Sequence, residues 1–231
     1  FLDGEHQRVA SLTMAEIERF DIGRLNADTE YGRRFPDQAQ MDGVRVPRLG
    51  ELLNLVSQPR YATACLMLEL KSDPDFAQDS AVRERIVSVI CRDVREAKLA
   101  DRTLLHSFDW ALLEECRRQA PDMPLSFLTQ LQDNEHDVGE DSSILVTPDF
   151  SKREMSVPYE VSKAGGSLWC PHFTELGADD LAYARELGLA VAAWTVNEPD
   201  DIEAMIDLRV DAIVTDYPGR VQQRLSERGF R

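Results

Sequence analysis

From Ala64 onward, short apolar runs alternate with amphipathic segments, and this alternation limits the chain to a small set of folds. Six runs are expected to be strands, and none has the polar alternation of a sheet with one face in water. They are residues 64–71, 103–108, 124–129, 167–173, 190–196 and 212–217. Strands that alternate with helices form a parallel sheet with both faces covered, so the predicted fold class is α/β.

The segments between these runs have the spacing and the end signals of helices. Asp109 stands where an N-cap belongs, Pro199 stands in a first turn, and Gly188 stands where a helix would stop. Two of these helices have an apolar face that can be specified. The faces are Val82, Ile86, Val89 and Ile90 in the first helix and Leu112, Leu113 and Cys116 in the second.

The first sixty residues have a different pattern and are expected to be an insertion with a helix. Residues 13–16 form a capping box, residues 23–45 are irregular and polar, and a second helix is expected between Pro47 and Pro59. We therefore expect one domain over residues 1–231, with the insertion and helix in 1–60 and six βα units in 61–231.

Composition restricts the partners of the chain. It has 42 Asp and Glu against 26 Lys and Arg, a formal net charge of −16, which disfavours nucleic acid or an anionic membrane as a partner. No apolar run is long enough for stable membrane insertion, so a small molecule is expected, in a cytoplasmic or periplasmic compartment that the sequence leaves open. The cysteines have no metal-site spacing and are expected in the core: Cys65, Cys91, Cys116 and Cys170.

The carboxyl ends of barrel strands converge on one pocket, so polar residues there are the candidates for function. Glu69 and Lys71 end the first run two residues apart, which places both side chains on one side of the strand. One interpretation is a structural ion pair. The other is a metal and phosphate site, in which Glu69 supplies an oxygen ligand to Ca²⁺ or Mg²⁺ and Lys71 neutralises a phosphate oxygen.

Other strand ends carry further candidates. Trp194 either fills the barrel mouth or stacks on the carbon skeleton of a polyol. Asp216 is expected to cap the helix that follows Pro218 in preference to contacting substrate. His106 and His172 also end strands, where a lone histidine is more often a hydrogen-bonded structural residue than a ligand.

Two features lie outside the strand ends. Residues 132–141 are crowded with acidic side chains and are expected to form a solvated loop, with a lid or a second cation site as the alternative. His6 and His136 lie in irregular polar segments.

Four motifs occur in an order that resembles the glycerophosphodiester phosphodiesterase family. Two earlier segments, residues 13–16 and 45–52, also look like segments that this family places before its third strand, so the resemblance covers nearly the whole chain. The four motifs are Glu69-Leu70-Lys71, Ser107-Phe108-Asp109, Trp194-Thr195-Val196-Asn197 and Thr215-Asp216-Tyr217-Pro218.

The resemblance implies a (β/α)8 TIM-type barrel that hydrolyses glycerophosphodiesters to glycerol 3-phosphate and an alcohol with a bound divalent cation, Ca²⁺ or Mg²⁺. By position, Glu69 matches a metal ligand and Trp194 matches the aromatic residue that lines the glycerol side of the pocket. Lys71 matches the catalytic residue that contacts the phosphate and the metal region. The implied partner is a small-molecule glycerophosphodiester.

The chain departs from the family at its start. The family's His-Arg-Gly, Glu-x-Asp and His-Asp segments should precede residue 1, and none occurs ahead of the first expected strand in this sequence. We therefore expect six of eight strands, with the first two βα units missing, and impaired activity, because the absent histidines would act as general acid and base. The alternatives are a noncatalytic phosphodiester-binding module and a phospholipase-like phosphodiesterase.

Overall fold

A computed structural model of the chain describes residues 9–72, 78–131, 148, 150 and 156–230. The chain divides into two compact units, residues 1–62 and residues 63–231. The expectation of one domain stays a prediction.

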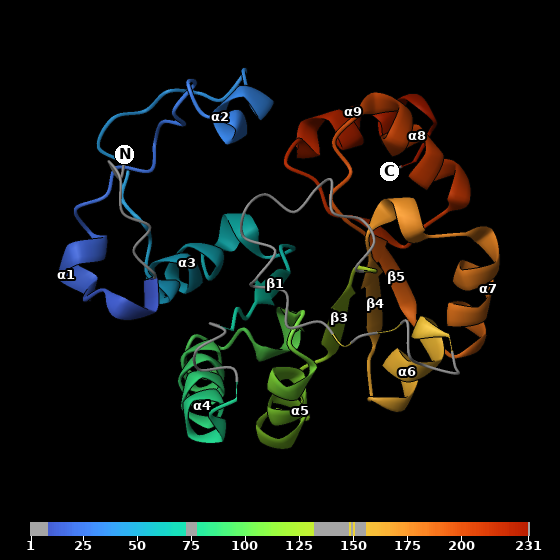
Figure 1. The fold of residues 1–231 in the computed structure, drawn as a ribbon, viewed down its shortest axis with the longest axis horizontal. Coiled ribbons are helices and arrows are strands. Elements are labelled where there is room, and N and C mark those ends of the chain that lie inside the picture. Colours follow the sequence, from blue (N-terminus) through green and yellow to red (C-terminus); the bar gives the residue numbers. More distant parts are fainter. Residues whose placement is uncertain (1–8, 73–77, 132–147, 149, 151–155, 231) are drawn as a thin grey trace. The chain divides into compact units, whose positions relative to one another are not determined.

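The first unit consists of short helices joined by irregular chain (Figure 1). The capping box is confirmed, because the Thr13 N–H donates to Glu16 Oε2 at 2.7 Å. A helix also interrupts the polar stretch expected to be irregular, where the Thr29 hydroxyl caps it by accepting from the Gly32 N–H at 3.0 Å. The elements are η1 (Val9–Ser11), α1 (Met14–Ile17), α2 (Glu30–Arg34), α3 (Leu49–Val56) and η2 (Pro59–Tyr61).

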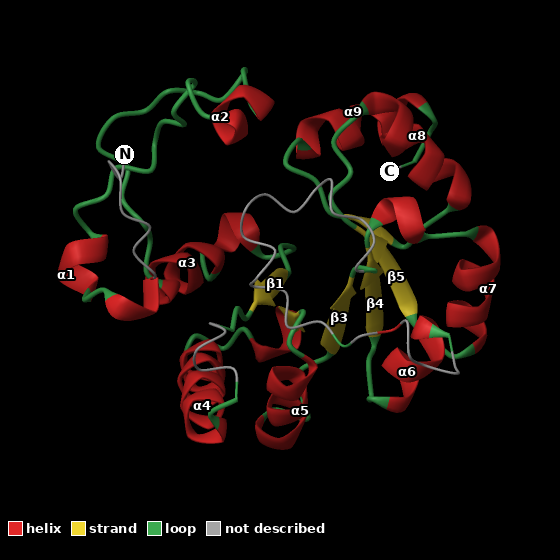
Figure 2. Ribbon diagram, in the orientation of Figure 1, coloured by secondary structure: helices red, strands yellow, loops and turns green. Residues whose placement is uncertain are grey.

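The second unit contains a parallel sheet of six strands in chain order, with helices between them (Figure 2). The strands are β1 (Leu66–Glu69), β2 (Thr103–Ser107), β3 (Leu125–Thr129), β4 (Leu168–Pro171), β5 (Ala190–Ala193) and β6 (Ala212–Ile213). The sheet curls into a half-barrel, which confirms the α/β fold class and the six expected strands. Closure by two further strands stays a prediction.

The helices of this unit follow the strands along the chain. Asp109 caps α5 and Gly188, with φ +78°, follows the end of α7, as predicted. The elements are α4 (Ser80–Glu96), η3 (Ala100–Arg102), α5 (Trp110–Gln119), α6 (Val157–Lys163), η6 (Phe173–Glu175), α7 (Ala178–Glu186), α8 (Pro199–Leu208) and α9 (Pro218–Glu227).

The two faces of the sheet pack differently. Alternate strand residues point to opposite faces, and those on the outer face, such as Leu105, Phe127 and Val191, are fully buried. The inner face carries a second apolar cluster that extends toward the strand ends. It consists of Leu128, Cys170 and Ala192, with Phe108, Leu168, Trp194 and Val214 packed against them.

Three expectations about burial are wrong. The buried face of α4 is Val87, Cys91 and Val94, whereas Val89 is 40% exposed, so the packed stripe lies about 100° around the helix from the predicted one. Cys65 is exposed, because it precedes β1 at the edge of the sheet. For the same reason Met67 within β1 is 39% exposed, so this strand is not covered on both faces.

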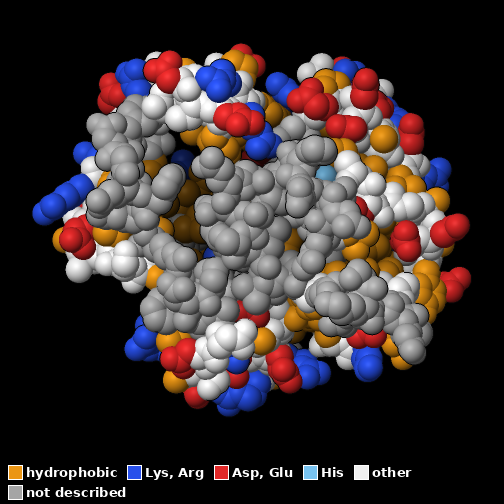
Figure 3. Space-filling view, viewed as in Figure 1, with side chains coloured by type: hydrophobic (Ala, Val, Ile, Leu, Met, Phe, Trp, Pro, Cys, Tyr) orange, Lys and Arg blue, Asp and Glu red, His pale blue; other side chains and the backbone are white. Residues whose placement is uncertain are grey.

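The described surface carries charges of both signs. On the face shown in Figure 3, Lys and Arg side chains lie scattered among Asp and Glu side chains. Among the described residues, no helix combines the length and the apolarity that a membrane span requires.

Candidate active site

Glu69 and Lys71 lie together at the carboxyl end of β1. The Lys71 ammonium donates to Glu69 Oε1 at 2.7 Å, so the ion pair of the structural interpretation does form. The Glu69 side chain is 33% exposed and the Lys71 side chain 69% exposed. An ion pair this exposed contributes about 0–1 kcal/mol to stability. The pair therefore stabilises the fold little and leaves both charges accessible to a ligand.

Glu69 faces the inner side of the curled sheet. In the parallel register it pairs with His106 of β2. Burial raises the pKa of the Cys170 thiol in β4, and the Glu69 carboxylate adds to the rise. The register also pairs His106 with Ser126 and Ser126 with Leu168 of the inner cluster, so Glu69 lies on the same face of the sheet as that cluster. The first strand end thus points inward, as predicted.

The segment that ends β2 holds the end of β1 in place. The Ser107 hydroxyl donates to the Leu70 carbonyl at 2.6 Å and accepts from the Asp109 N–H at 3.0 Å. The Asp109 carboxylate is buried, accepts from two backbone N–H groups of α5 and also accepts from the Ser72 hydroxyl. Because Leu70 and Ser72 flank Lys71, these hydrogen bonds fix the backbone that carries the candidate phosphate-binding side chain.

His106 lies on the inner face of β2 and is 5% exposed. Its Nδ1 is 2.7 Å from the Ser126 hydroxyl of β3. Burial lowers the pKa of the imidazole to about 4, and the Glu69 carboxylate opposes this shift. The expectation of a hydrogen-bonded histidine is confirmed. Its partner was not expected, although Ser126 is the polar residue that interrupts the apolar run of β3 and could have been found by that signal.

Trp194 stands among aromatic rings just after β5. Its indole N–H donates to the Cys170 carbonyl at 3.0 Å. The Phe108 and His172 rings meet it edge to face, with centroids 5.2 and 5.0 Å away. The His172 Nδ1 is in turn 2.8 Å from the Thr174 hydroxyl. Trp194 is half-buried, so it both packs on the inner cluster and keeps part of its surface accessible. Its contact with substrate stays a prediction.

Asn197 and Asp216 tie together the loops after β5 and β6. The Asn197 side-chain N–H donates to Asp216 Oδ2 at 2.8 Å, and its Oδ1 accepts from the Asp216 N–H at 2.9 Å. The N-cap of α9 is Tyr217, without a side-chain cap hydrogen bond. The prediction that Asp216 caps this helix is wrong, because its carboxylate accepts from Asn197 and joins two of the four motifs.

The structure brings several of the predicted residues together. Glu69 lies beside Lys71 and acts electrostatically on His106, and Trp194 lies against His172. The acidic segment 132–141 and both His6 and His136 lie outside the described residues, so the expectations for them are not tested.

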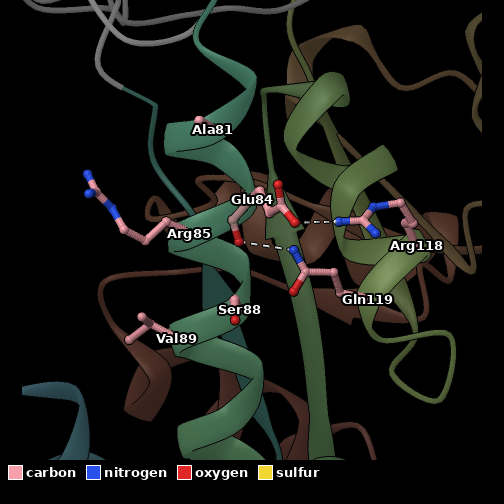
Figure 4. A pocket seen from close by; sticks show the side chains of 7 residues that line it. All are labelled: Ala81, Glu84, Arg85, Ser88, Val89, Arg118 and Gln119. Atoms are coloured by element: carbon pink, nitrogen blue, oxygen red, sulfur yellow. Dashed lines mark hydrogen bonds and ion pairs between the residues drawn. The ribbon is translucent and has the colours of Figure 1, made fainter.

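A groove on the outside of the unit lies between α4 and α5 (Figure 4). Its lining comes from Ala81, Glu84, Arg85, Ser88 and Val89 of α4 and Arg118 and Gln119 of α5. Glu84 pairs with Arg118 at 3.2 Å, and the Gln119 side-chain N–H donates to the Glu84 carbonyl at 3.0 Å. These bonds link the two helices, and no residue of the strand ends lines the groove, so we assign it no catalytic role.

Comparison with known proteins identifies the family. The model of the glycerophosphoryl diester phosphodiesterase family matches residues 3–220. The chain belongs to this family. A solved structure from Silicibacter pomeroyi that carries the family's name is 49% identical, with a TM-score of 0.89 over 99% of this chain and 72% of that chain.

Two more distant proteins are also similar to this chain. A glycerophosphodiester phosphodiesterase of Caldanaerobacter subterraneus subsp. tengcongensis is 23% identical over 91% of this chain and 70% of its own length. A phosphodiesterase of Oleispira antarctica, solved in complex with the product sn-glycerol-3-phosphate, is 16% identical, with a TM-score of 0.67 over 94% of this chain and 72% of that chain. The latter likeness shows the fold alone. The predicted resemblance and the enzyme class, a glycerophosphodiester phosphodiesterase, are thus confirmed.

Proposed function

We propose that the carboxyl end of this half-barrel binds glycerophosphodiesters and serves their metal-dependent hydrolysis to glycerol 3-phosphate and an alcohol. The observation that carries the proposal is the accessible Glu69–Lys71 pair on the inner side of β1. Family membership supports it, and so does the glycerol 3-phosphate bound to the Oleispira antarctica relative.

Two side chains have roles that follow from their chemistry. The Lys71 ammonium would leave Glu69 to donate to a phosphate oxygen, where it would stabilise negative charge as the diester is cleaved. The half-buried Trp194 would present its accessible surface to the carbon skeleton of the glycerol group. Both roles require only that the substrate enters the inner side of the strand ends.

A divalent cation is part of the proposal, with Glu69 as one ligand. Such an ion would polarise a phosphate oxygen when bound. Ca²⁺ takes six to eight oxygen ligands, and within residues 9–72, 78–131, 148, 150 and 156–230 no three His, Cys, Asp or Glu side chains gather to hold a metal. The described residues therefore supply one ligand and do not complete a centre, so we derive no step through the ion.

The 231 residues by themselves are proposed to turn over slowly, because they contain no His-Arg-Gly segment and no His-Asp segment ahead of the first strand, where the family carries its acid and base histidines. The same feature favours the alternative of a phosphodiester-binding module that retains the pocket. We expect glycerol 3-phosphate release from glycerophosphocholine in Ca²⁺ to be about a hundredfold slower than in a version extended with those segments. Comparable rates would refute the histidine argument, and inactivity of both forms together with retained binding would favour the binding module.

The roles of Glu69 and Lys71 predict different effects of substitution on ligand binding. Lys71→Met is expected to weaken the binding of sn-glycerol 3-phosphate about tenfold, since a hydrogen bond to a charged group contributes about 1.5–3 kcal/mol. Glu69→Gln is expected to bind as well as the native chain in EDTA, where a carboxylate only repels phosphate, but to gain no affinity when Ca²⁺ is added.

Isothermal titration calorimetry in EDTA and in Ca²⁺ measures both effects. The control is Lys163→Met, because Lys163 is exposed in the last turn of α6 and has the same charge. A Lys71 variant that binds like the Lys163 variant would show that the ion pair has only a structural role.

A further inference from the structure

The inner face of β2 carries a polar group that the proposed function has not used. His106 pairs in register with Glu69 of β1 on one side and with Ser126 of β3 on the other. It is therefore level with the candidate metal ligand and deeper than Lys71, where the bottom of a pocket at the strand ends would lie. Most buried polar side-chain atoms have a hydrogen-bond partner, so a ring nitrogen without one in the protein requires an explanation.

The hydrogen bond to Ser126 fixes how the ring is turned. Nδ1 lies 2.7 Å from the Ser126 hydroxyl on the β3 side of the ring. The two ring nitrogens point in nearly opposite directions, so Nε2 faces away from β3 and into the interior on the side of Glu69. Among the residues that the structure describes, Nε2 has no hydrogen-bond partner, and it is not one of the fully buried polar atoms, so a ligand can reach it although the residue is only 5% exposed.

The Ser126 hydroxyl can either donate to Nδ1 or accept from it, and the first arrangement leaves Nε2 as the donor. When the hydroxyl donates to Nδ1, the proton of a neutral imidazole is on Nε2. A neutral donor beside Lys71 adds a directional hydrogen bond without adding a second positive charge.

We propose that His106 is a substrate-binding residue whose Nε2–H donates to an oxygen of the glycerol phosphate group bound by Lys71, with Ser126 fixing its orientation. This inference rests on the proposed function, because it requires that glycerol 3-phosphate occupies the inner side of the strand ends.

Two substitutions separate a ligand contact from a structural role. The amide of Asn reaches the position of Nδ1, so His106→Asn keeps the bond to Ser126 and loses the group at Nε2. The amide of Gln reaches the position of Nε2, so His106→Gln does the reverse. Calorimetry with sn-glycerol 3-phosphate in Ca²⁺ is expected to show binding about tenfold weaker for His106→Asn and near native for His106→Gln.

A structural role predicts the opposite order, with His106→Gln the weaker binder, and that order or equal affinity for both variants would overturn the proposal. If neither variant folds, ¹⁵N NMR of the native chain decides instead. The proposal requires a ring with the proton on Nε2 whose Nε2 resonance moves on titration with sn-glycerol 3-phosphate, and a resonance that stays fixed while the ligand binds would overturn it. A native chain that binds no glycerol 3-phosphate would refute the proposed function first, and this inference with it.

Discussion

Lowering the pH from 7 to 4 is expected to reduce the free energy of unfolding by about 3 kcal/mol through His106 alone. The folded pKa is about 4 because the ring is buried, against the ordinary value of 6.5. Between these values the unfolded chain binds a proton that the folded chain does not, so stability falls as the pH falls. A difference of about 2.5 pKa units corresponds to about 3 kcal/mol, at 1.36 kcal/mol for each unit.

The matched comparison for this prediction is His106→Gln, which cannot titrate. Urea unfolding of both chains in EDTA at pH 7 and pH 4 subtracts the contribution of every other group that titrates. The native chain is expected to lose about 3 kcal/mol more than the variant over this range. Parallel losses would show that the imidazole of His106 is accessible to protons in the folded state, contrary to its 5% exposure.

The strands could be predicted from the sequence because a parallel sheet imposes a local signal. Each of the six runs is rich in apolar residues, and part of each run forms a strand. Helix faces were harder to predict. In α4, apolar residues occur on more than one side of the helix. Val82 and Ile86 mark one possible buried face, and Val87 and Cys91 mark another. Only packing in the folded chain decides which face is buried. The short helix α2 forms through its Thr29 cap, without any apolar periodicity.

The candidate site divides in the same way. Glu69, Lys71 and Trp194 could be selected because they stand at strand ends, a position that sequence reveals. The hydrogen-bond partners around these residues could not be predicted, because those partners depend on the register between strands. Ser126 is 20 residues from His106, and Ser72 is 37 residues from Asp109. Asp216 shows the error that follows, since a local cap was expected and Asn197, 19 residues away, is its partner.

Two aspartates of this chain perform the same local task in different surroundings. Asp79 caps α4 and Asp109 caps α5, each through Oδ1 and two backbone N–H groups. Their backbone angles are nearly equal, with φ −87° and ψ 105° for Asp79 and φ −84° and ψ 100° for Asp109. Asp79 is exposed, whereas Asp109 is 3% exposed and also accepts from Ser72. Substituting each aspartate in turn therefore separates the contribution of a helix cap to stability from that of the connection between Asp109 and the end of β1.

Asp109→Ala is expected to lower the free energy of unfolding by about 4 kcal/mol, against about 1 kcal/mol for Asp79→Ala. Loss of a cap accounts for about 1 kcal/mol in each, and the remainder in Asp109→Ala comes from buried donors and the Ser72 hydroxyl left without an acceptor, at about 1–3 kcal/mol for each group. Urea unfolding at pH 7 measures the difference. Because Ser72 adjoins Lys71, only Asp109→Ala should also weaken the binding of sn-glycerol 3-phosphate under conditions where both variants are folded. Equal effects of the two substitutions on stability and binding would mean that the segment after β2 only caps a helix and does not position the candidate site.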